Sequence, residues 1–163
     1  ITHQDSEGNK GVTRAGEVQV MSAGSGVVHS EHNYSNEPLT LFQIWIEPNK
    51  SGVKPRWDAR QFPAELNQEG LPLLVSGFEE DTDAALFIHQ HARIFGGKVA
   101  KAATFSHEIT HQAYVLASSG KFQLDDGQHA IVLEKGDGAE VTNSQVLTIT
   151  AQEKGELIII DAP

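Results

Sequence analysis

The sequence predicts an all-β protein made of two antiparallel units of the double-barrel kind. Short segments rich in Val, Ile, Leu and aromatic residues recur along the chain, and no long segment keeps an apolar period of 3.6 residues. Turn clusters fall at Ser6–Asn9, Asp125–Gly127 and Lys135–Gly138, where Gly, Asn and Asp tolerate positive φ. Short apolar segments that alternate with tight turns are typical of antiparallel sheets.

Strands are expected where the apolar segments lie between turn clusters. Their expected positions are Ile1–Asp5, Val12–Arg14, Val18–Met21, Val27–Glu31, Leu39–Glu47, Leu71–Ser76, Ala85–Phe95, Gln112–Ala117, Phe122–Leu124, Ala130–Leu133, Val146–Thr150 and Glu156–Asp161. Within Leu39–Glu47, the aromatic residues Phe42 and Trp45 are expected to lie in the core.

A proline-containing stretch divides the chain. Four of the six prolines lie between Pro48 and Pro72. We predict the remainder of an N-terminal barrel over residues 1–62 and a connector over 63–84. A short helical turn is expected near Ala64–Gln68, and a C-terminal barrel over residues 85–163.

An approximate internal repeat supports two related units. The residues Asp5, Val12 and Gly16 have equivalents 120 positions later, at Asp125, Val132 and Gly136. Both copies have the order strand, acidic turn, strand, Gly turn, strand.

Charge and composition exclude several classes of protein. The chain has 12 Lys and Arg against 22 Asp and Glu, a formal charge of -10, and its basic residues are scattered. This disfavours direct binding to nucleic acid or to anionic membranes. No run approaches the roughly 20 apolar residues of a membrane span, so we expect a soluble, cytoplasmic protein. Because the chain has no cysteine, a metal would be held by His, Asp, Glu or water.

The segment Gly16–Glu31 holds the main candidate site. Gly24 and Gly26 permit a tight turn, and on the following strand His29 and Glu31 are two residues apart and therefore share a face. An imidazole and a carboxylate on one face are half of a non-haem Fe, Mn, Ni or Cu site. The sequence therefore predicts part of a metal centre at this strand.

The residues HQDSEGN and GEVQVMSAGSGVVHSE, which end at Glu31, resemble the pirin family of the cupin superfamily. They are most similar to bacterial pirin-like quercetin 2,3-dioxygenases. The likeness continues through Leu41–Ile46 and Pro55-Arg56 and extends more faintly to the C-terminus. Gly26-x2-His29-x3-Asn33 also resembles the end of the second cupin motif. The resemblance implies a bicupin of two antiparallel barrels or jelly rolls, of which the N-terminal one is incomplete.

The resemblance also implies the roles of the site residues. His29 and Glu31 would be metal ligands, and Glu31 would be catalytic because it would accept the proton of a flavonol 3-hydroxyl. In the family, the other two ligands form a His-x-His pair on a preceding strand. We therefore expect that pair upstream of Ile1 and interpret this chain as a fragment; the alternative is a natural short form that cannot build the usual site. Met21 and Gln43 are candidates for the substrate pocket.

The implied cofactor is one divalent metal, whether Fe, Cu, Ni, Mn or Zn, and we expect this chain alone to bind it weakly or not at all. The implied substrates are a flavonol such as quercetin and O2. An alternative is a non-catalytic regulatory protein of the transcriptional-cofactor type, which would act through a protein partner. Residues Gly138–Asn143 offer no counterpart of His29-Ser30-Glu31, so the second barrel is expected to be metal-free.

The remaining histidines allow other interpretations. His3 is expected to be structural, and His32 to lie at the surface. His89-Gln90-His91 has the His-x-His spacing, but it begins the second unit and would have to reach the other barrel. His107–His111 matches the HExxH pattern of zinc metalloproteases, for which His129 would be a third ligand. The strand-forming residues around that match argue against the helix that such proteases need.

Overall fold

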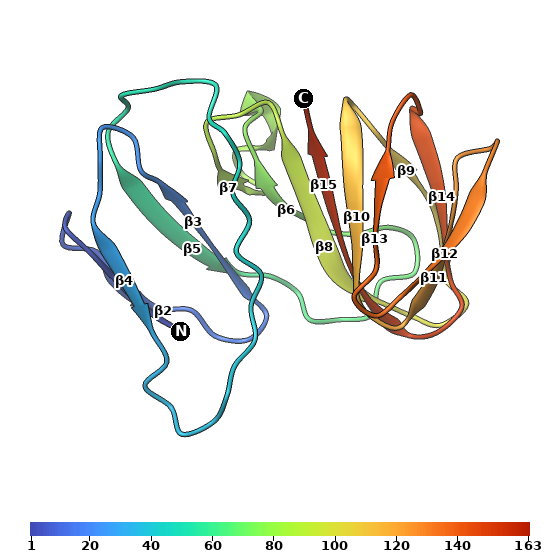
Figure 1. The fold of residues 1–163 in the computed structure, drawn as a ribbon, viewed down its shortest axis with the longest axis horizontal. Helices are drawn as coiled ribbons and strands as arrows, with labels where there is room; N and C mark the ends of the chain where they lie inside the picture. The colour runs from blue at the N-terminus through green and yellow to red at the C-terminus, as the bar shows by residue number, and fades with distance from the viewer.

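The computed structural model describes residues 1–163 and consists almost entirely of β-strands (Figure 1). Its one helical element is the 3-10 helix η1, Glu79–Asp81, and no helix has the length and apolar content needed to cross a membrane. The N-terminal strands are β1 Thr2–Asp5, β2 Lys10–Val12, β3 Glu17–Ser22, β4 His29–His32 and β5 Arg56–Gln61. The C-terminal strands are β6 Leu73–Ser76, β7 Leu86–Phe87, β8 Arg93–Val99, β9 Thr104–Glu108, β10 Gln112–Ser119, β11 Lys121–Asp125, β12 Ala130–Glu134, β13 Gly138–Val141, β14 Val146–Ala151 and β15 Gly155–Ala162.

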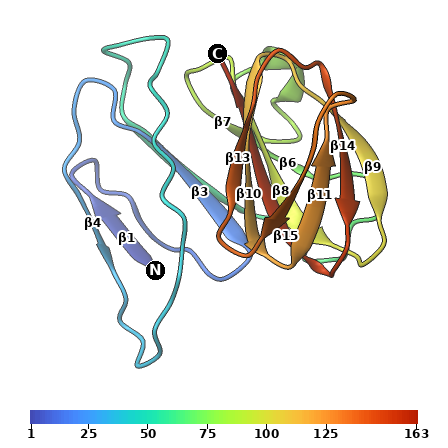
Figure 2. The same cartoon turned by 45° about the vertical axis from the view of Figure 1, so that its right-hand side comes forward.

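The C-terminal strands form two facing sheets, seen as two layers in Figures 1 and 2. One sheet has the order β13-β10-β15-β8-β6-β7 and the other has the order β12-β11-β14-β9. A core of 17 buried residues lies between them, including the fully buried Phe122, Ile149 and Leu157. Burial alternates along β15, as expected for a strand with one face on the core. This is a jelly-roll arrangement.

The N-terminal strands form a smaller, open unit beside this jelly roll (Figure 2). A three-stranded sheet of order β2-β1-β4 faces the two-stranded ribbon β3-β5. Val20 of β3 packs with Val75, Leu86 and Ile94, so a small apolar cluster joins the two units. The prediction of an all-β fold with an incomplete N-terminal barrel is confirmed.

The internal repeat is visible in the hydrogen bonds of the turns. The backbone N–H of Glu17 donates to the carbonyl of Arg14 at 3.0 Å, and the side chain of Glu17 accepts from the N–H of Arg14 at 2.6 Å. Asp137 and Glu134, 120 positions later, make the same two bonds at 2.9 Å each. The repeat therefore extends from the sequence to local geometry.

The predicted strand Leu39–Glu47 is wrong, because residues 33–55 contain no strand. The side chains of Phe42 and Trp45, expected in the core, are 55% and 87% exposed. The cause is the lack of a partner. In the C-terminal unit, the strand that corresponds to this segment is β15, because it follows β14 as this segment follows β4. Strand β15 pairs with β8 on one side and with β10 on the other. Nothing comparable flanks residues 39–47, so their backbone groups cannot form a ladder.

Other differences lie around the proline-containing stretch. Strand β5 lies within it and pairs with β3, and the helical turn expected near Ala64–Gln68 does not form. The expected strand Ala85–Phe95 is divided into β7 and β8 by a loop. Strand β6, within the predicted connector, pairs with β8 of the C-terminal sheet. Strands β9 and β13 were not foreseen, since polar residues interrupt their apolar pattern.

One ionisable side chain is enclosed in the C-terminal core. His107 is 7% exposed, and its ring meets that of Phe95 edge to face with 4.6 Å between the ring centres. Its Nε2 has no hydrogen-bond partner. Burial lowers the pKa of His107 below the ordinary histidine value, against the opposing effect of the negative charges of Asp161 and Glu108. The folded core therefore favours the neutral imidazole.

We expect the free energy of unfolding to decrease as the pH falls below about 6.5, because the unfolded chain then protonates His107 more readily than the folded chain does. In His107→Leu this part of the pH dependence is lost, whereas the exposed-site control His111→Leu retains it. Urea unfolding between about pH 5 and pH 8 measures the difference. If the free energy of unfolding changed with pH in the same way in the wild type and in His107→Leu, this role of His107 would be contradicted.

Candidate metal centre

The register between β1 and β4 places four functional side chains on one face of the N-terminal sheet. His3 pairs with Glu31, and Asp5 pairs with His29. Directly opposed residues of an antiparallel pair share a face, as do residues two apart along a strand. All four side chains therefore project to the same side of the sheet, toward the ribbon β3-β5.

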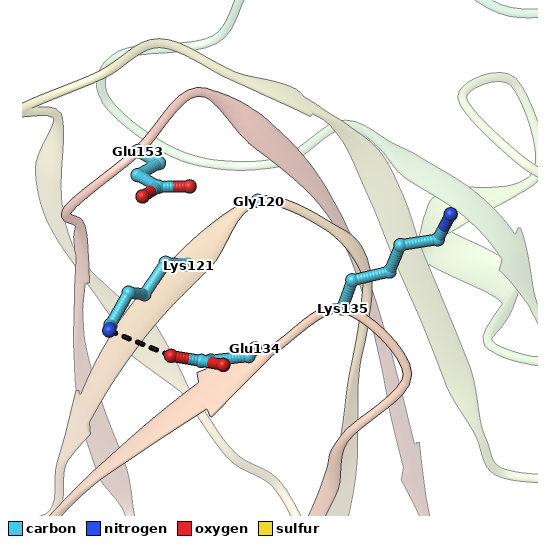
Figure 3. Close-up of a pocket in the computed structure, with 5 residues that line it drawn as sticks. All are labelled: Gly120, Lys121, Glu134, Lys135 and Glu153. Atoms are coloured by element: carbon cyan, nitrogen blue, oxygen red, sulfur yellow. Dashed lines mark hydrogen bonds and ion pairs between the residues drawn. The ribbon is translucent and has the colours of Figure 1, made fainter.

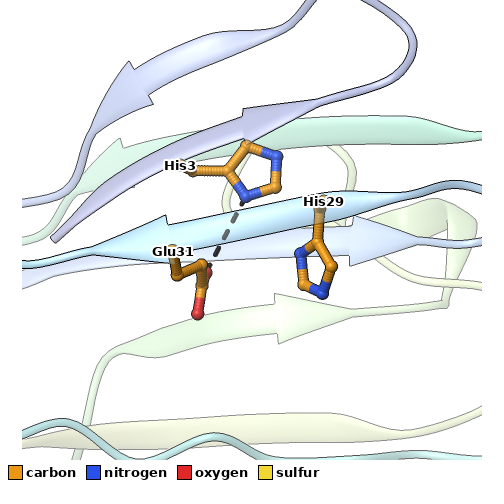
Figure 4. A group of neighbouring side chains, drawn as sticks. All are labelled: His3, His29 and Glu31. Atoms are coloured by element: carbon orange, nitrogen blue, oxygen red, sulfur yellow. Dashed lines mark ion pairs between the residues drawn. The ribbon is translucent and has the colours of Figure 1, made fainter.

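Three of these side chains converge (Figure 4). The potential ligand atoms of His3, His29 and Glu31 all lie within 4.8 Å of one another, and His3 Nδ1 is 3.8 Å from Glu31 Oε1. His3 is 1% exposed, Glu31 is half-buried and His29 is exposed, so the group is open on the His29 side. Two imidazoles and one carboxylate are a donor set that first-row divalent metals accept.

Asp5 determines which nitrogen of His3 carries the proton. Its Oδ2 lies 3.3 Å from His3 Nε2, and its oxygens also accept from the backbone N–H groups of Glu7 at 3.0 Å and Asn9 at 2.9 Å. Partial burial opposes ionisation, but the hydrogen bonds from Asn9, His3 and Glu7 outweigh it and lower the pKa of Asp5 to about 2. The carboxylate only accepts, so the hydrogen is on Nε2.

In the neutral imidazole, His3 Nδ1 consequently presents its lone pair to the site. This atom is buried and has no hydrogen-bond partner, and the nearest acidic oxygen is Glu31 Oε1. A lone pair that faces a carboxylate oxygen is repelled unless a metal ion or a second proton lies between them. The orphaned nitrogen therefore fits a bound metal ion.

The position of each predicted ligand follows from its strand. His29 and Glu31 share a face as their two-residue spacing requires, and their role as ligands stays a prediction. His3 was assigned no role at the site, and the structure brings it there through pairing with Glu31. The signal available in the sequence was the spacing of His3 and Asp5, which also puts these two side chains on one face.

Met21, but not Gln43, lies on a strand that faces this group. Met21 is half-buried on β3, opposite Trp57 of β5. Gln43 is exposed in the strand-free segment 33–55. Their assignment to a substrate pocket stays a prediction.

Two other histidine motifs lie outside the group of His3, His29 and Glu31. His89 and His91 lie between β7 and β8, where their rings contact Phe87 and Phe78 with 4.8 and 5.6 Å between ring centres. They are not part of the group around Glu31. The HExxH match at His107–His111 spans strand β9 and the following turn, so the helix of a zinc metalloprotease is absent and that alternative is wrong.

His32 is exposed and stacks on Tyr34, with 5.3 Å between ring centres, as expected for a surface residue. A polar hollow on the C-terminal unit, of about 270 Å³, is lined by Gly120, Lys121, Glu134, Lys135 and Glu153 (Figure 3). Lys121 Nζ and Glu134 Oε1 form an ion pair at 2.7 Å there. The charges of this pair satisfy each other, so the hollow offers no second donor set.

Comparisons with known proteins identify the family. The pirin family model matches residues 1–46, and the model of the quercetinase C-terminal cupin domain matches residues 73–162. The pirin-like protein of Caulobacter vibrioides is 41% identical over 164 residues, which cover 99% of this chain and 68% of that protein. The chain belongs to the pirin family.

Further similarities agree with this assignment. The quercetin 2,3-dioxygenase of Escherichia coli K12 is 32% identical to this pirin over 166 residues, which cover 100% of the chain and 68% of the relative. The structure of bacterial pirin YhhW from Escherichia coli in complex with nickel(II) superposes with a TM-score of 0.87 at 32% identity. That match covers 99% of this chain and 67% of YhhW. This pirin chain thus spans about two thirds of these relatives.

We expect the chain to bind Ni2+ weakly, because only three protein donors converge. His29→Ala or Glu31→Ala should reduce the affinity by more than about tenfold. His32→Ala, on the same strand but outside the group, should leave it unchanged. Competition with a chromophoric chelator measures these affinities. An equal loss in all three variants would show that Ni2+ binds elsewhere.

Proposed function

We propose that this pirin is a metal-dependent dioxygenase that oxidises flavonols such as quercetin with O2. The observation that carries the proposal is the convergence of His3, His29 and Glu31 around the orphaned His3 Nδ1. It is supported by the similarity to the quercetin 2,3-dioxygenase of Escherichia coli and to YhhW, whose structure contains nickel(II).

His29 and Glu31 would hold a divalent metal, with His3 Nδ1 in reach of the same ion. Iron, copper, nickel, manganese and zinc all accept nitrogen and oxygen donors of this kind. When bound, such a metal polarises the oxygens of a flavonol and lowers the pKa of its hydroxyl.

The free edge of β4 offers a place for further ligands. In the C-terminal unit, β14 pairs with β11 on one side and β9 on the other, whereas β4 pairs only with β1. On β9 the alternate residues Phe105 and His107 both face the core. A His-x-His strand beside β4, placed as β9 is beside β14, would direct two imidazoles toward the face that bears His29 and Glu31.

Glu31 is suited to accept a proton from the substrate. Its Oε1 accepts a hydrogen bond from Gln19 Nε2, while its Oε2 has no hydrogen-bond donor in the protein. The free oxygen could take the proton of a flavonol 3-hydroxyl that enters from the exposed His29 side. His29 would then orient the metal, and Glu31 would both orient it and move the proton.

Quercetin consumption and O2 uptake test this function with Fe, Cu, Ni, Mn and Zn, on this chain and on a longer form that includes a His-x-His strand. Glu31→Gln should reduce kcat by about 10² or more, because the amide cannot accept the proton. His32→Gln is the matched control and should retain activity. Unchanged turnover in Glu31→Gln would remove Glu31 from the reaction. Metal binding without any flavonol turnover would instead favour a non-catalytic binding protein.

A further inference from the structure

We infer that Gln19 is a positioning residue, which holds the Glu31 carboxylate in one orientation through a hydrogen bond whose direction Thr13 and Trp57 enforce. The inference deepens the proposed function and rests on it for the role of Glu31. It concerns the ribbon β3-β5 and the loop before it, which cover the ligand face of the N-terminal sheet.

The two ends of the Gln19 amide are distinguished by chemistry. Trp57 Nε1–H donates to Gln19 Oε1 at 3.3 Å, and the hydroxyl of Thr13 donates to the same oxygen at 2.8 Å. An indole N–H can only donate, so the atom that it contacts must be the carbonyl oxygen. The amide nitrogen is then at the other end, where it donates to Glu31 Oε1.

The indole itself is fixed between two strands. Its ring stacks on His3 with 5.3 Å between ring centres and 15° between planes. The indole also lies against Gly11 of β2, the residue that pairs with His3 of β1. A Cβ atom at Gly11 would be 2.4 Å from Trp57 Cη2, so only glycine leaves room for the ring. The direction of the indole N–H is therefore determined by packing.

These contacts prevent the Glu31 carboxylate from rotating freely. Its Oε1, the oxygen nearest His3 Nδ1, is engaged by an amide that cannot turn over without losing its bonds with Trp57 and Glu31, and Oε2 stays free for the substrate proton. Contacts that orient a metal ligand in this way commonly contribute about 10- to 100-fold in affinity. Gln19 is neutral and exchanges no proton, so its role is orientation alone.

Ni2+ affinity of the full chain, measured by chelator competition, tests the inference. Gln19→Leu should weaken binding about 10- to 100-fold. Thr13→Val and Trp57→Phe should each have a smaller effect, and Thr13→Ser, which keeps the hydroxyl, should retain wild-type affinity.

A double-mutant test of Ni2+ affinity distinguishes a positioning role of Gln19 from a general structural role. In the Gln19→Leu background, Thr13→Val should cause no further loss of Ni2+ affinity, because the Thr13 hydroxyl acts through the missing amide. A further loss in that background would overturn the inference. So would a Gln19→Leu variant with a lower melting temperature and unchanged affinity.

A second readout needs no metal. In NMR spectra of the metal-free chain, Glu31→Ala should shift the side-chain amide resonances of Gln19, and Thr13→Ser should not. If the wild type binds no Ni2+, the NMR result alone tests the role of Gln19. Gln19 amide resonances that do not respond to Glu31→Ala would then overturn the inference. Neither measurement uses quercetin, so a failure of flavonol turnover would overturn the dioxygenase proposal and leave the role of Gln19 standing.

Discussion

The antiparallel pairing of β1 with β4 is the constraint on which the candidate site depends. Its register brings His3 to Glu31 and Asp5 to His29, and a slip of one residue would turn one member of each pair to the opposite face. The register is secured beyond the strands, because the N–H of Ser6 donates to the carbonyl of Val28 at 2.8 Å and the Ser6 hydroxyl accepts from the N–H of Val28 at 3.1 Å. The site is thus determined by backbone hydrogen bonds before any ligand is considered.

Local pattern was sufficient to predict part of this arrangement. Short apolar segments between turn residues, without a helical period, indicated an all-β fold, and the two-residue spacing of His29 and Glu31 indicated a shared face. The contacts of His3 and Gln19 were not predictable in this way. Apart from the local bonds with Asp5 and Thr13, they join residues that are 12 to 54 positions apart in the chain, and their formation depends on strand register and on the ribbon β3-β5 folding over the sheet.

The errors share a physical cause, because a residue pattern describes one segment while a strand or a metal site needs several. Leu39–Glu47 has the apolar residues of a strand, but no strand pairs with it to form a ladder. The HExxH match has the right residues, but the ladder with β14 holds its first half in an extended conformation. In both cases the surrounding chain, rather than the segment, decided the structure.

The contrast between the two tryptophans has a practical consequence. Trp45 is almost fully in solvent, while Trp57 lies against a histidine of the candidate metal group. Their fluorescence should therefore differ in emission wavelength, with the solvated indole emitting to the red. A paramagnetic ion near His3 would quench Trp57 selectively, which gives the molecule an intrinsic optical reporter of whether its ligand face is occupied.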